Sequence, residues 1–340
     1  MIPDKLMDKI LDKNIPLSVS FELTWRCNLR CVHCYQYSPC DNELTTDEVK
    51  DILDQLARAG SFYLSLTGGE PLMRKDFLQI AEYVRKKTFS IILQTNGTLI
   101  TPSMAKRIKD LNFTQVHISL LGAKATTHDQ ITRVKGSFQE AIKAAELLKE
   151  KGVSVILKTT FMKQNVAEHR EIKELSDRLG MKLGTSPIIY PKNDMGQDPI
   201  QYRVSDKDIK EIYSYFSEED PHTYKNAYKN LRKKESSLLC GFGRVACGIN
   251  PKGEVYPCVG LPIVVGNLRK KRFAQIWEEA EVLNDIRKTK DSDLKRCFRC
   301  GSSSICFRCS ALAWFEKGDL WGVPEECCRV TNSVKEVIVK

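Results

Sequence analysis

The sequence predicts an α/β protein built as a partial (β/α)6 barrel of the TIM type, followed by a small cysteine-rich domain. Two observations predict this architecture. Six apolar runs of strand length alternate strictly with six helical patterns over residues 16–216. Near residue 235 this alternation stops, glycine and proline become frequent, and nine of the 13 cysteines follow.

The predicted strands are short runs of apolar and β-branched residues between turn signals. The first of them is the run at 16–24, which follows a short amphipathic helix over 1–15 with Leu6, Ile10 and Leu11 on one face. The other five strands lie at 62–67, 90–95, 115–120, 153–161 and, with a weaker pattern, 182–189.

The predicted helices between these strands have recognisable ends. Thr45 and Glu48 form a capping box that begins a helix at 45–59, and Gly60 ends it. Glycines also end two later helices. These two lie at 137–151 and 166–179, and the remaining three at 76–87, 102–110 and 205–216.

Strict alternation of strands and helices favours parallel strands joined by right-handed crossovers. Six units fall short of the eight that close a full barrel, so we expect an open, partial barrel. Beyond it, residues 246–258 read as a hairpin with its turn at 250–253, and 273–287 read as a helix. We expect three parts: an N-terminal helix at 1–15, the barrel at 16–235, and at 236–340 a domain stapled by metal because it is too small to rely on an apolar core.

Composition points to a cytosolic protein without a membrane or nucleic-acid partner. No apolar run approaches the ~20 residues that cross a bilayer, and the charged N-terminus lacks the apolar core of a signal peptide. The formal net charge is +10, but the most basic run, at 269–272, lacks interleaved aromatic residues and reads as a solvated turn. In a reducing cytosol, clustered cysteines indicate metal rather than disulfides.

Cys27, Cys31 and Cys34 follow the first predicted strand directly. Three thiolates hold three irons of a four-iron cluster and leave the fourth iron without a protein ligand, whereas a cluster that only carries electrons normally has four cysteines. An open iron can bind a small molecule and pass it an electron. This triad therefore predicts chemistry at an iron.

Polar or glycine-rich segments also follow the next three strands. Because ligands bind at the carboxyl ends of parallel strands, these segments are expected to share a rim with the triad and form a cofactor pocket. Gly68 and Gly69 allow close approach of the backbone, and Glu70 supplies a carboxylate for a cationic group. Asn96 follows the third strand, and Ser119 ends the fourth.

Here the chain resembles the radical S-adenosylmethionine (SAM) enzymes, on Cys27, Cys31, Cys34 and the motif 68–71, over about residues 16–190. In that family, SAM chelates the open iron, and one electron cleaves it to a 5′-deoxyadenosyl radical that takes a hydrogen atom from the substrate. The resemblance implies a set of SAM contacts. They are Gly68, Gly69 and Glu70 for the amino group, Asn96 on the same rim, Ser119 for the ribose, His33 for the adenine and Arg133 for the carboxylate. The alternative for Arg133 is an ordinary surface arginine.

The C-terminal cysteine spacing resembles the SPASM extension of these enzymes, which holds two auxiliary 4Fe-4S clusters. By that resemblance, one cluster is bound by Cys240, Cys247, Cys258 and Cys309. The other is bound by Cys297, Cys300, Cys306 and Cys327, which makes three 4Fe-4S clusters in all and leaves Cys40 and Cys328 spare.

Two departures from the family pattern keep alternatives open at this point. The last pair, Cys306 and Cys309, is one residue closer than usual, and the adjacent Cys327 and Cys328 leave the final ligand ambiguous. A zinc module is the competing interpretation of 297–309, but its two cysteine pairs would be closer together than zinc modules place them.

The resemblance implies an anaerobic oxidoreductase or maturase that modifies a ribosomally made peptide or protein by crosslinking, oxidation or epimerisation. A sulfatase maturase would have an aspartate after Cys258, where this chain has Val259. Without a fused leader-binding domain, a separate leader-binding protein is expected, together with a flavodoxin- or ferredoxin-type electron donor. The alternative is side-chain chemistry on a tetrapyrrole in an alternative haem or haem d1 pathway, which the hairpin at 247–258 resembles; a non-catalytic electron carrier would not need an open iron.

Overall fold

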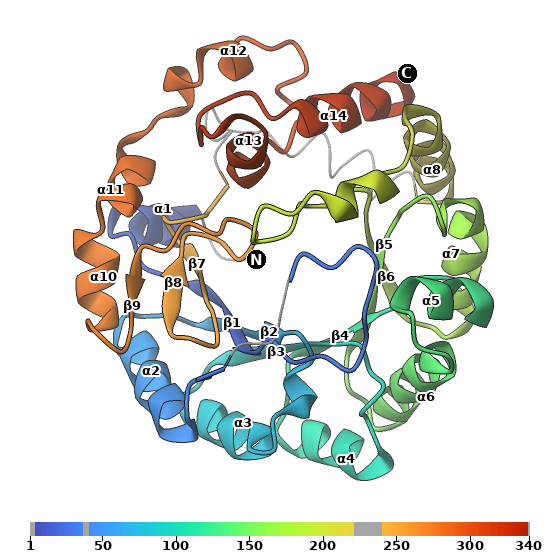
Figure 1. Ribbon diagram of the computed structural model, residues 1–340, viewed down its shortest axis with the longest axis horizontal. Coiled ribbons are helices and arrows are strands. Elements are labelled where there is room, and N and C mark those ends of the chain that lie inside the picture. The colour runs from blue at the N-terminus through green and yellow to red at the C-terminus, as the bar shows by residue number, and fades with distance from the viewer. Residues whose placement is uncertain (1–3, 37–40, 221–239, 339–340) are drawn as a thin grey trace.

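The computed structural model describes residues 4–36, 41–220 and 240–338. Its centre is a curved sheet of nine strands in the order β6-β5-β4-β3-β2-β1-β7-β8-β9, open between β6 and β9 (Figure 1). The strands are β1 Ser18–Thr24, β2 Tyr63–Gly68, β3 Ser90–Thr95, β4 Gln115–Ser119, β5 Val155–Thr160, β6 Lys182–Ser186, β7 Ala246–Ile249, β8 Glu254–Tyr256 and β9 Gly266–Asn267.

The first six strands are all parallel, as the alternation of strands and helices predicted. Helices lie outside the sheet and form a ring around it (Figure 1). They are α1 Asp4–Asp12, α2 Thr46–Arg58, α3 Phe77–Lys86, α4 Pro102–Asp110, α5 Ala125–Thr132, α6 Ser137–Glu150, α7 His169–Arg178, α8 Asp206–Glu219, α10 Phe273–Glu279, α11 Glu281–Lys288, α12 Lys295–Phe298, α13 Ser310–Lys317 and α14 Glu325–Ile338.

The two faces of β1 differ in chemistry. Val19, Phe21 and Leu23 point toward the helices and belong to the main hydrophobic core. Because side chains alternate along a strand, Ser20 and Glu22 point to the opposite face, inside the barrel. The core thus fixes the strand from outside, and polar side chains line its inner surface.

The C-terminal hairpin extends the sheet of the barrel. Strand β7 pairs in parallel with β1, with Val19 opposite Cys247, and β8 and β9 continue the sheet antiparallel. The capping box of α2 at Thr45 and Glu48 is present as predicted. The predicted helix over 273–287 is two helices, because Ala280 has an extended backbone between α10 and α11.

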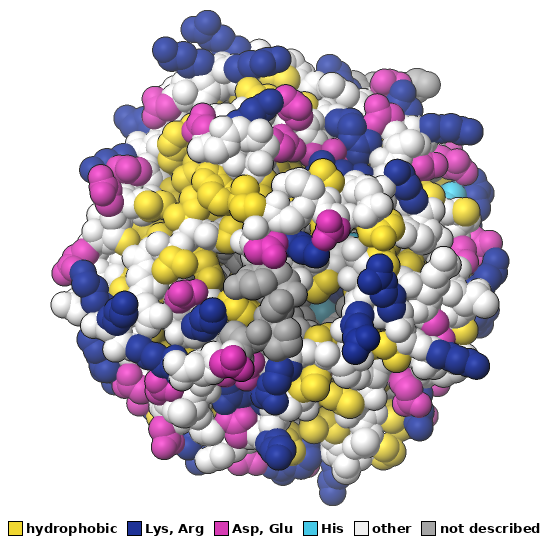
Figure 2. Space-filling model, viewed as in Figure 1, with side chains coloured by type: hydrophobic (Ala, Val, Ile, Leu, Met, Phe, Trp, Pro, Cys, Tyr) yellow, Lys and Arg dark blue, Asp and Glu magenta, His cyan; other side chains and the backbone are white. Residues whose placement is uncertain are grey.

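The chain after residue 280 continues the ring of helices across the open side of the sheet (Figure 1). Helix α14 packs on α8 through a separate hydrophobic cluster that includes Val330, Val334 and Phe216. Figure 2 shows hydrophobic side chains gathered on this face where Figure 1 places α13 and β7–β9, with Lys and Arg spread around the periphery. Among the residues that the structure describes, no helix is both long and apolar enough to cross a membrane.

Candidate cofactor and metal sites

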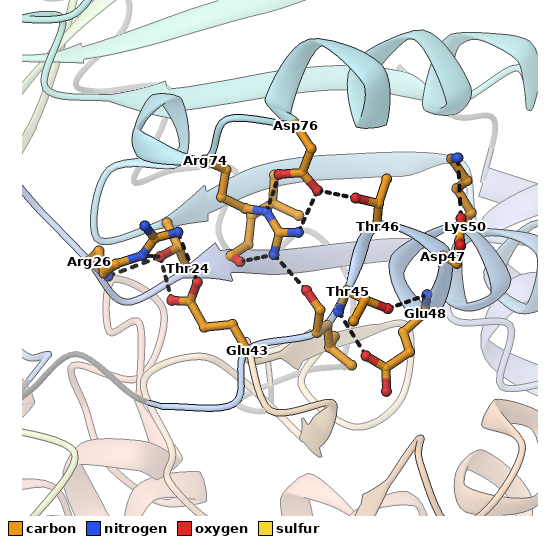
Figure 3. Close-up of polar contacts among 12 residues, drawn as sticks. Thr24, Arg26, Glu43, Thr45, Thr46, Asp47, Glu48, Lys50, Arg74 and Asp76 are labelled. Carbon is orange, nitrogen blue, oxygen red and sulfur yellow. Dashed lines mark hydrogen bonds and ion pairs between the residues drawn. The ribbon is translucent and has the colours of Figure 1, made fainter.

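The loop that carries Cys27, Cys31 and Cys34 begins at the end of β1. Its first residues are hydrogen-bonded to Glu43, which lies just before α2. Thr24 Oγ1 donates to Glu43, and Trp25 N donates to Glu43 Oε1 at 3.1 Å. Arg26 Nη2 forms an ion pair with Glu43 Oε2 at 3.1 Å (Figure 3). The loop is therefore closed at its base by one carboxylate.

Arg74 holds the same base from the other side (Figure 3). Its Nη1 donates to Leu23 O at 2.9 Å and to Leu44 O at 3.0 Å, so one guanidinium joins the end of β1 to the far end of the loop. Asp76 accepts from Arg74 Nε at 2.9 Å and Nη2 at 2.6 Å, and it also accepts from Thr46 in α2. Arg74 lies six residues after the end of β2, and its sequence context gives no signal for this role.

The structure brings the three thiols of the triad together. Cys27 is exposed, Cys31 and Cys34 are half-buried, and burial first, then the charges of Cys27 and Cys34, raise the pKa of Cys31. Among the described residues, no three His, Cys, Asp or Glu side chains converge closely enough to share one metal ion. A four-iron cluster does not require such convergence, because each of its irons takes its own ligand.

The glycines at the end of β2 let that strand approach the start of the cysteine loop. Gly68 has a φ of +132°, and a Cβ there would lie 2.2 Å from Thr24 O. A Cβ on Gly69 would lie 2.4 Å from Arg26 O. In this tight arrangement, Gly69 N donates to Thr24 O and Glu70 N donates to Arg26 O, each at 2.8 Å. Only glycine fits at both positions.

Glu70 is completely buried at the joint between β2 and β3. Its carboxylate accepts from Thr95 Oγ1 at 2.8 Å, Asn96 N at 2.8 Å and Leu72 N at 3.1 Å. Burial raises the pKa of Glu70 to about 7, against the opposing effect of these three donors. The side chain thus holds three segments of the rim in place.

Asn96 connects the rim to the triad. Its Nδ2 lies 3.9 Å from Cys27 Sγ and donates to Asn28 Oδ1 at 2.9 Å, while its Oδ1 accepts from Thr98 N at 2.9 Å. The end of β3 therefore contacts the first cysteine of the loop, as the shared rim predicted.

The other predicted SAM contacts are Arg133, Ser119 and His33. Arg30 N and Val32 N donate to the carbonyls of the last two residues of α5, each at 3.0 Å. Arg133, the next residue, is exposed and has a left-handed φ of +58°. Ser119 is half-buried at the end of β4. His33 Nδ1 is buried with no hydrogen-bond partner among the described residues, and burial lowers the pKa of His33 to about 4, so its ring is neutral near pH 7.

Glu22 is a further buried carboxyl in this region, and sequence analysis did not single it out. It is 2% exposed, on the inner face of β1. Its oxygens accept from Trp25 Nε1 and Tyr35 OH, each at 3.0 Å, and from Gln36. Burial raises the pKa of Glu22 to about 7. All three donors belong to the cysteine loop, so Glu22 also fixes its path.

The thiols of the first predicted auxiliary group influence one another electrostatically. The charge of Cys309 acts on Cys240 and Cys258, and the charge of Cys258 acts on Cys247. Burial raises the pKa of Cys247 and of Cys258 to about 12. Tyr190, which follows β6, lies with its hydroxyl 3.4 Å from Cys309 Sγ and so links this group to the barrel.

In the second group, the adjacent cysteines of α14 occupy different places. Cys328, which the sequence prediction left spare, is the one on which the charges of Cys306, Cys297 and Cys300 act. Cys327, the predicted ligand, is 2% exposed and faces Cys309 first and Cys306 second. The arrangement favours Cys328 over Cys327 beside the other three thiols. Cys40 lies outside the described residues.

These residues fit iron–sulfur clusters. Burial disfavours the thiolate form at most of these cysteines, as the raised pKa of Cys34 and of Cys258 shows. A positively charged metal core offsets that cost, and thiolates are the ligands that iron–sulfur clusters take. The unpartnered Nδ1 of His33, beside the triad, also leaves one polar atom available to a bound molecule.

Comparisons with known proteins agree with this geometry. The model of the radical SAM superfamily matches residues 21–176, and that of the SPASM iron-sulfur cluster-binding domain matches residues 240–301. The AdoMet-dependent heme synthase of Methanosarcina barkeri is 31% identical over 331 residues, which are 89% of this chain and 94% of that protein. The mycofactocin maturase MftC of Mycolicibacterium smegmatis is 30% identical over 332 residues, 92% of this chain and 82% of that protein.

Among solved structures, Streptococcus suis SuiB bound to the precursor peptide SuiA has a TM-score of 0.74 at 18% identity, covering 95% of this chain and 79% of that one. This likeness shows the shared fold. The two sequence relatives, which match over nearly the whole chain, show the family. The chain belongs to the radical SAM superfamily and carries a SPASM domain, and it is therefore an enzyme that uses S-adenosylmethionine at a 4Fe-4S cluster and holds auxiliary iron–sulfur clusters.

Proposed function

We propose that Cys27, Cys31 and Cys34 ligate the SAM-binding cluster. The observation that carries this proposal is the position of the loop that holds them: it begins at the end of β1 and brings Cys27 Sγ to 3.9 Å from Asn96 Nδ2, just after β3. When bound there, SAM supplies a 5′-deoxyadenosyl radical after one-electron cleavage. The protein's own contribution is to hold the loop, exclude water and orient the bound molecule.

The proposed SAM contacts divide between backbone and side chains. Gly68 and Gly69 present backbone atoms that no Cβ shields, and together with the buried Glu70 they are the proposed contacts of the amino group. His33 presents a neutral ring for the adenine, with its Nδ1 unpartnered among the described residues. The remaining contacts are Asn96 on the rim, Ser119 for the ribose and Arg133 for the carboxylate.

The auxiliary clusters are assigned by the same reasoning. We assign Cys240, Cys247, Cys258 and Cys309 to the first cluster, because their charges act on one another. For the second cluster we assign Cys328 in place of Cys327. Its other ligands are Cys297, Cys300 and Cys306.

For the substrate, a ribosomally made peptide is the favoured class. The mycofactocin maturase aligns over 92% of this chain, and the face of the molecule around α13 and β7–β9 carries hydrophobic side chains suited to a peptide (Figure 2). A separate leader-binding protein and a flavodoxin- or ferredoxin-type donor complete this proposal. No disulfide joins any of the twelve cysteines that the structure describes, which supports work in the reducing cytosol.

A second candidate is side-chain chemistry on an iron-porphyrin. The observation that favours it is the AdoMet-dependent heme synthase, which is 31% identical and matched over 94% of its length. The two substrates differ in what they need from the protein, since a porphyrin is rigid and a peptide must be held along its length.

The core chemistry is tested with anaerobically reconstituted protein. We expect about twelve irons per chain, and release of 5′-deoxyadenosine from SAM when dithionite is present. Changing Cys27, Cys31 and Cys34 together to alanine should abolish that release and leave about eight irons. Cleavage that survives the triple change would contradict the assignment of the triad.

The substrate is tested by mass spectrometry after co-expression with each short open reading frame that neighbours the gene. Loss of two hydrogen atoms indicates a crosslink or oxidation, and deuterium uptake without another mass change indicates epimerisation. Incubation with an iron-porphyrin is the parallel experiment. A changed porphyrin together with unchanged peptides would replace the peptide proposal by the porphyrin one.

A further inference from the structure

Arg308 is a buried cation held by neutral groups. Its side chain is 3% exposed, next to the proposed ligand Cys309. It donates to Ser310 Oγ at 2.6 Å, to Leu320 O at 2.7 Å and to Gly322 O at 2.7 Å. Its Nε is buried without a hydrogen-bond partner in the described part of the chain. These acceptors fix the guanidinium but do not neutralise it.

Arg287, in α11, is held in the same way. Its Nε donates to Gly243 O at 3.0 Å, and its Nη1 donates to Trp277 O at 2.6 Å and Asn284 Oδ1 at 3.4 Å. The guanidinium lies over the Trp277 ring at 4.4 Å. Its Nη2 is buried without a partner among the described residues. A second fixed cation thus lies in the C-terminal part of the molecule.

Both arginines face cysteines of the first auxiliary group. Neither arginine forms an ion pair with a carboxylate in the described ranges, and a buried charge is costly unless it is paired. Arg308 directly precedes Cys309 in the chain, and Arg287 Nε binds Gly243 O at 3.0 Å in the turn between Cys240 and Cys247. The charge of Arg308 also acts on Cys240, and that of Arg287 acts on Cys247. Both cysteines belong to the first auxiliary group.

The second group has a weaker cationic environment. Arg296 acts on Cys328, but its side chain is exposed, so water screens its charge. A third arginine near the first group, Arg244, is half-buried and faces Asp291 ahead of Cys240, whereas Arg287 faces Cys247 ahead of Glu278. The buried Arg308 and the half-buried Arg287 therefore give the first group the stronger cationic environment.

We propose that Arg287 and Arg308 raise the reduction potential of the first auxiliary cluster, so that it accepts an electron before the second. Four thiolates on a cluster core give a net charge of about −2, which one electron makes about −3. Fixed cations and N–H donors aimed at the ligand sulfurs stabilise the more negative state. The inference rests on the proposed ligand set.

The test is an EPR-monitored redox titration of the full-length, anaerobically reconstituted protein with dithionite. The signal of the first cluster is the one that disappears in Cys258→Ala. In Arg308→Gln and in Arg287→Gln, we expect the electron affinity of that cluster to fall at least tenfold, which is about 59 mV for a one-electron couple. Arg308→Lys should restore part of the shift, and Arg296→Gln should leave the first cluster unchanged.

Iron content and SAM cleavage are measured on each variant. If the wild-type protein lacks auxiliary-cluster iron, the ligand set fails and the inference fails with it. If the wild type holds all three clusters and neither glutamine variant shifts the potential of the first, the inference alone is overturned. Should the buried Arg308 variant fail to load iron, the half-buried Arg287 variant decides the question.

Discussion

Arg133 shows how a single residue can separate a structural from a functional role. It ends α5 with a φ of +58°, a conformation that costs a side-chain-bearing residue roughly 1–2 kcal/mol. Such strain persists where the surroundings impose it, and it clusters at ligand sites. The position beside the cysteine loop fits the proposed contact with the SAM carboxylate.

Replacing Arg133 by glycine should relieve that strain and stabilise the cluster-free protein by about 0.5–1 kcal/mol in urea unfolding. It should at the same time weaken SAM binding to the reconstituted enzyme severalfold. Thr88 is the matched control, because it is exposed and has a φ of +63° far from the loop. Thr88→Gly should give the stability gain alone. Unchanged SAM affinity in Arg133→Gly would show that Arg133 is a surface residue that does not contact SAM.

Glu22 gives a prediction on pH. Burial raises its pKa from 4.5 to about 7 in the fold, so the folded state binds the proton more tightly than the unfolded chain does. Its contribution to stability is therefore complete below about pH 4.5 and is lost as the pH rises through about 7. At 1.36 kcal/mol per pH unit, the loss is on the order of 3 kcal/mol.

Urea unfolding of the cluster-free protein between pH 5 and pH 8 should accordingly show stability that falls with pH. Glu70, whose pKa burial also raises to about 7, contributes in the same direction. Glu22→Gln removes only the first contribution, so its slope should be roughly half as steep. A slope equal to that of the wild type would show that Glu22 is ionised throughout.

At the scale of the elements, Arg74 joins β1 to the loop that returns to α2. Arg74→Met leaves the buried carbonyls of Leu23 and Leu44 without a donor, and each unsatisfied group costs about 1–3 kcal/mol. We expect a loss of about 3 kcal/mol in urea unfolding and a reduced iron content at the triad.

The control for Arg74 is Arg107, which forms an exposed ion pair with Glu82 on neighbouring helices. Arg107→Met should cost less than about 1 kcal/mol and leave the iron content unchanged. Equal losses in the two variants would mean that the hydrogen bonds of Arg74 do not hold the loop.

Helix α14 separates its two cysteines by geometry. Successive residues of a helix point about 100° apart, so Cys327 and Cys328 cannot present their sulfurs to the same cluster equally well. Cys328→Ala should lose about four irons, whereas Cys327→Ala should keep all of them. Iron analysis together with the EPR signal of the second cluster decides between them, and loss of iron in Cys327→Ala would restore the original assignment.

Elements with strong local signals were predictable. The strand at 90–95 and the helix at 102–110 coincide with β3 and α4, because apolar runs and turn residues define their ends. The break at Ala280 and helix α5 were missed, since no glycine or proline marks the first and the second is too weakly amphipathic. Their structure depends on packing that the local sequence does not encode.

The same distinction holds at the candidate site. The spacing of cysteines and glycines is recognisable in the sequence, and it identified the triad and the motif at 68–70. Glu22, Arg74 and Arg308 are charged residues in strands and loops, where sequence alone suggests exposure. Only the three-dimensional arrangement shows that each is buried and holds a ligand-bearing segment.

At the scale of the whole molecule, the C-terminal segment depends on metal in a way the barrel does not. The six parallel strands bury a continuous apolar core with the surrounding helices. Between α11 and α13, by contrast, the chain over 289–309 forms only a 3-10 turn at Asp291–Asp293 and the four-residue α12. Of this segment, only Leu294, Ser302, Ile305 and Arg308 are buried. Small segments of this kind take their stability from bound metal.

Hydrogen exchange measured by mass spectrometry should therefore separate the two parts. Removal of all iron should make 289–309 exchange rapidly, while β1–β6 stay protected by their core. The triple alanine variant of Cys27, Cys31 and Cys34, which keeps the auxiliary clusters, should protect 289–309 as the wild type does. Uniform loss of protection across the barrel and the C-terminal segment would instead show one cooperative unit, in which the strand β7 beside β1 transmits the loss of metal to the whole sheet.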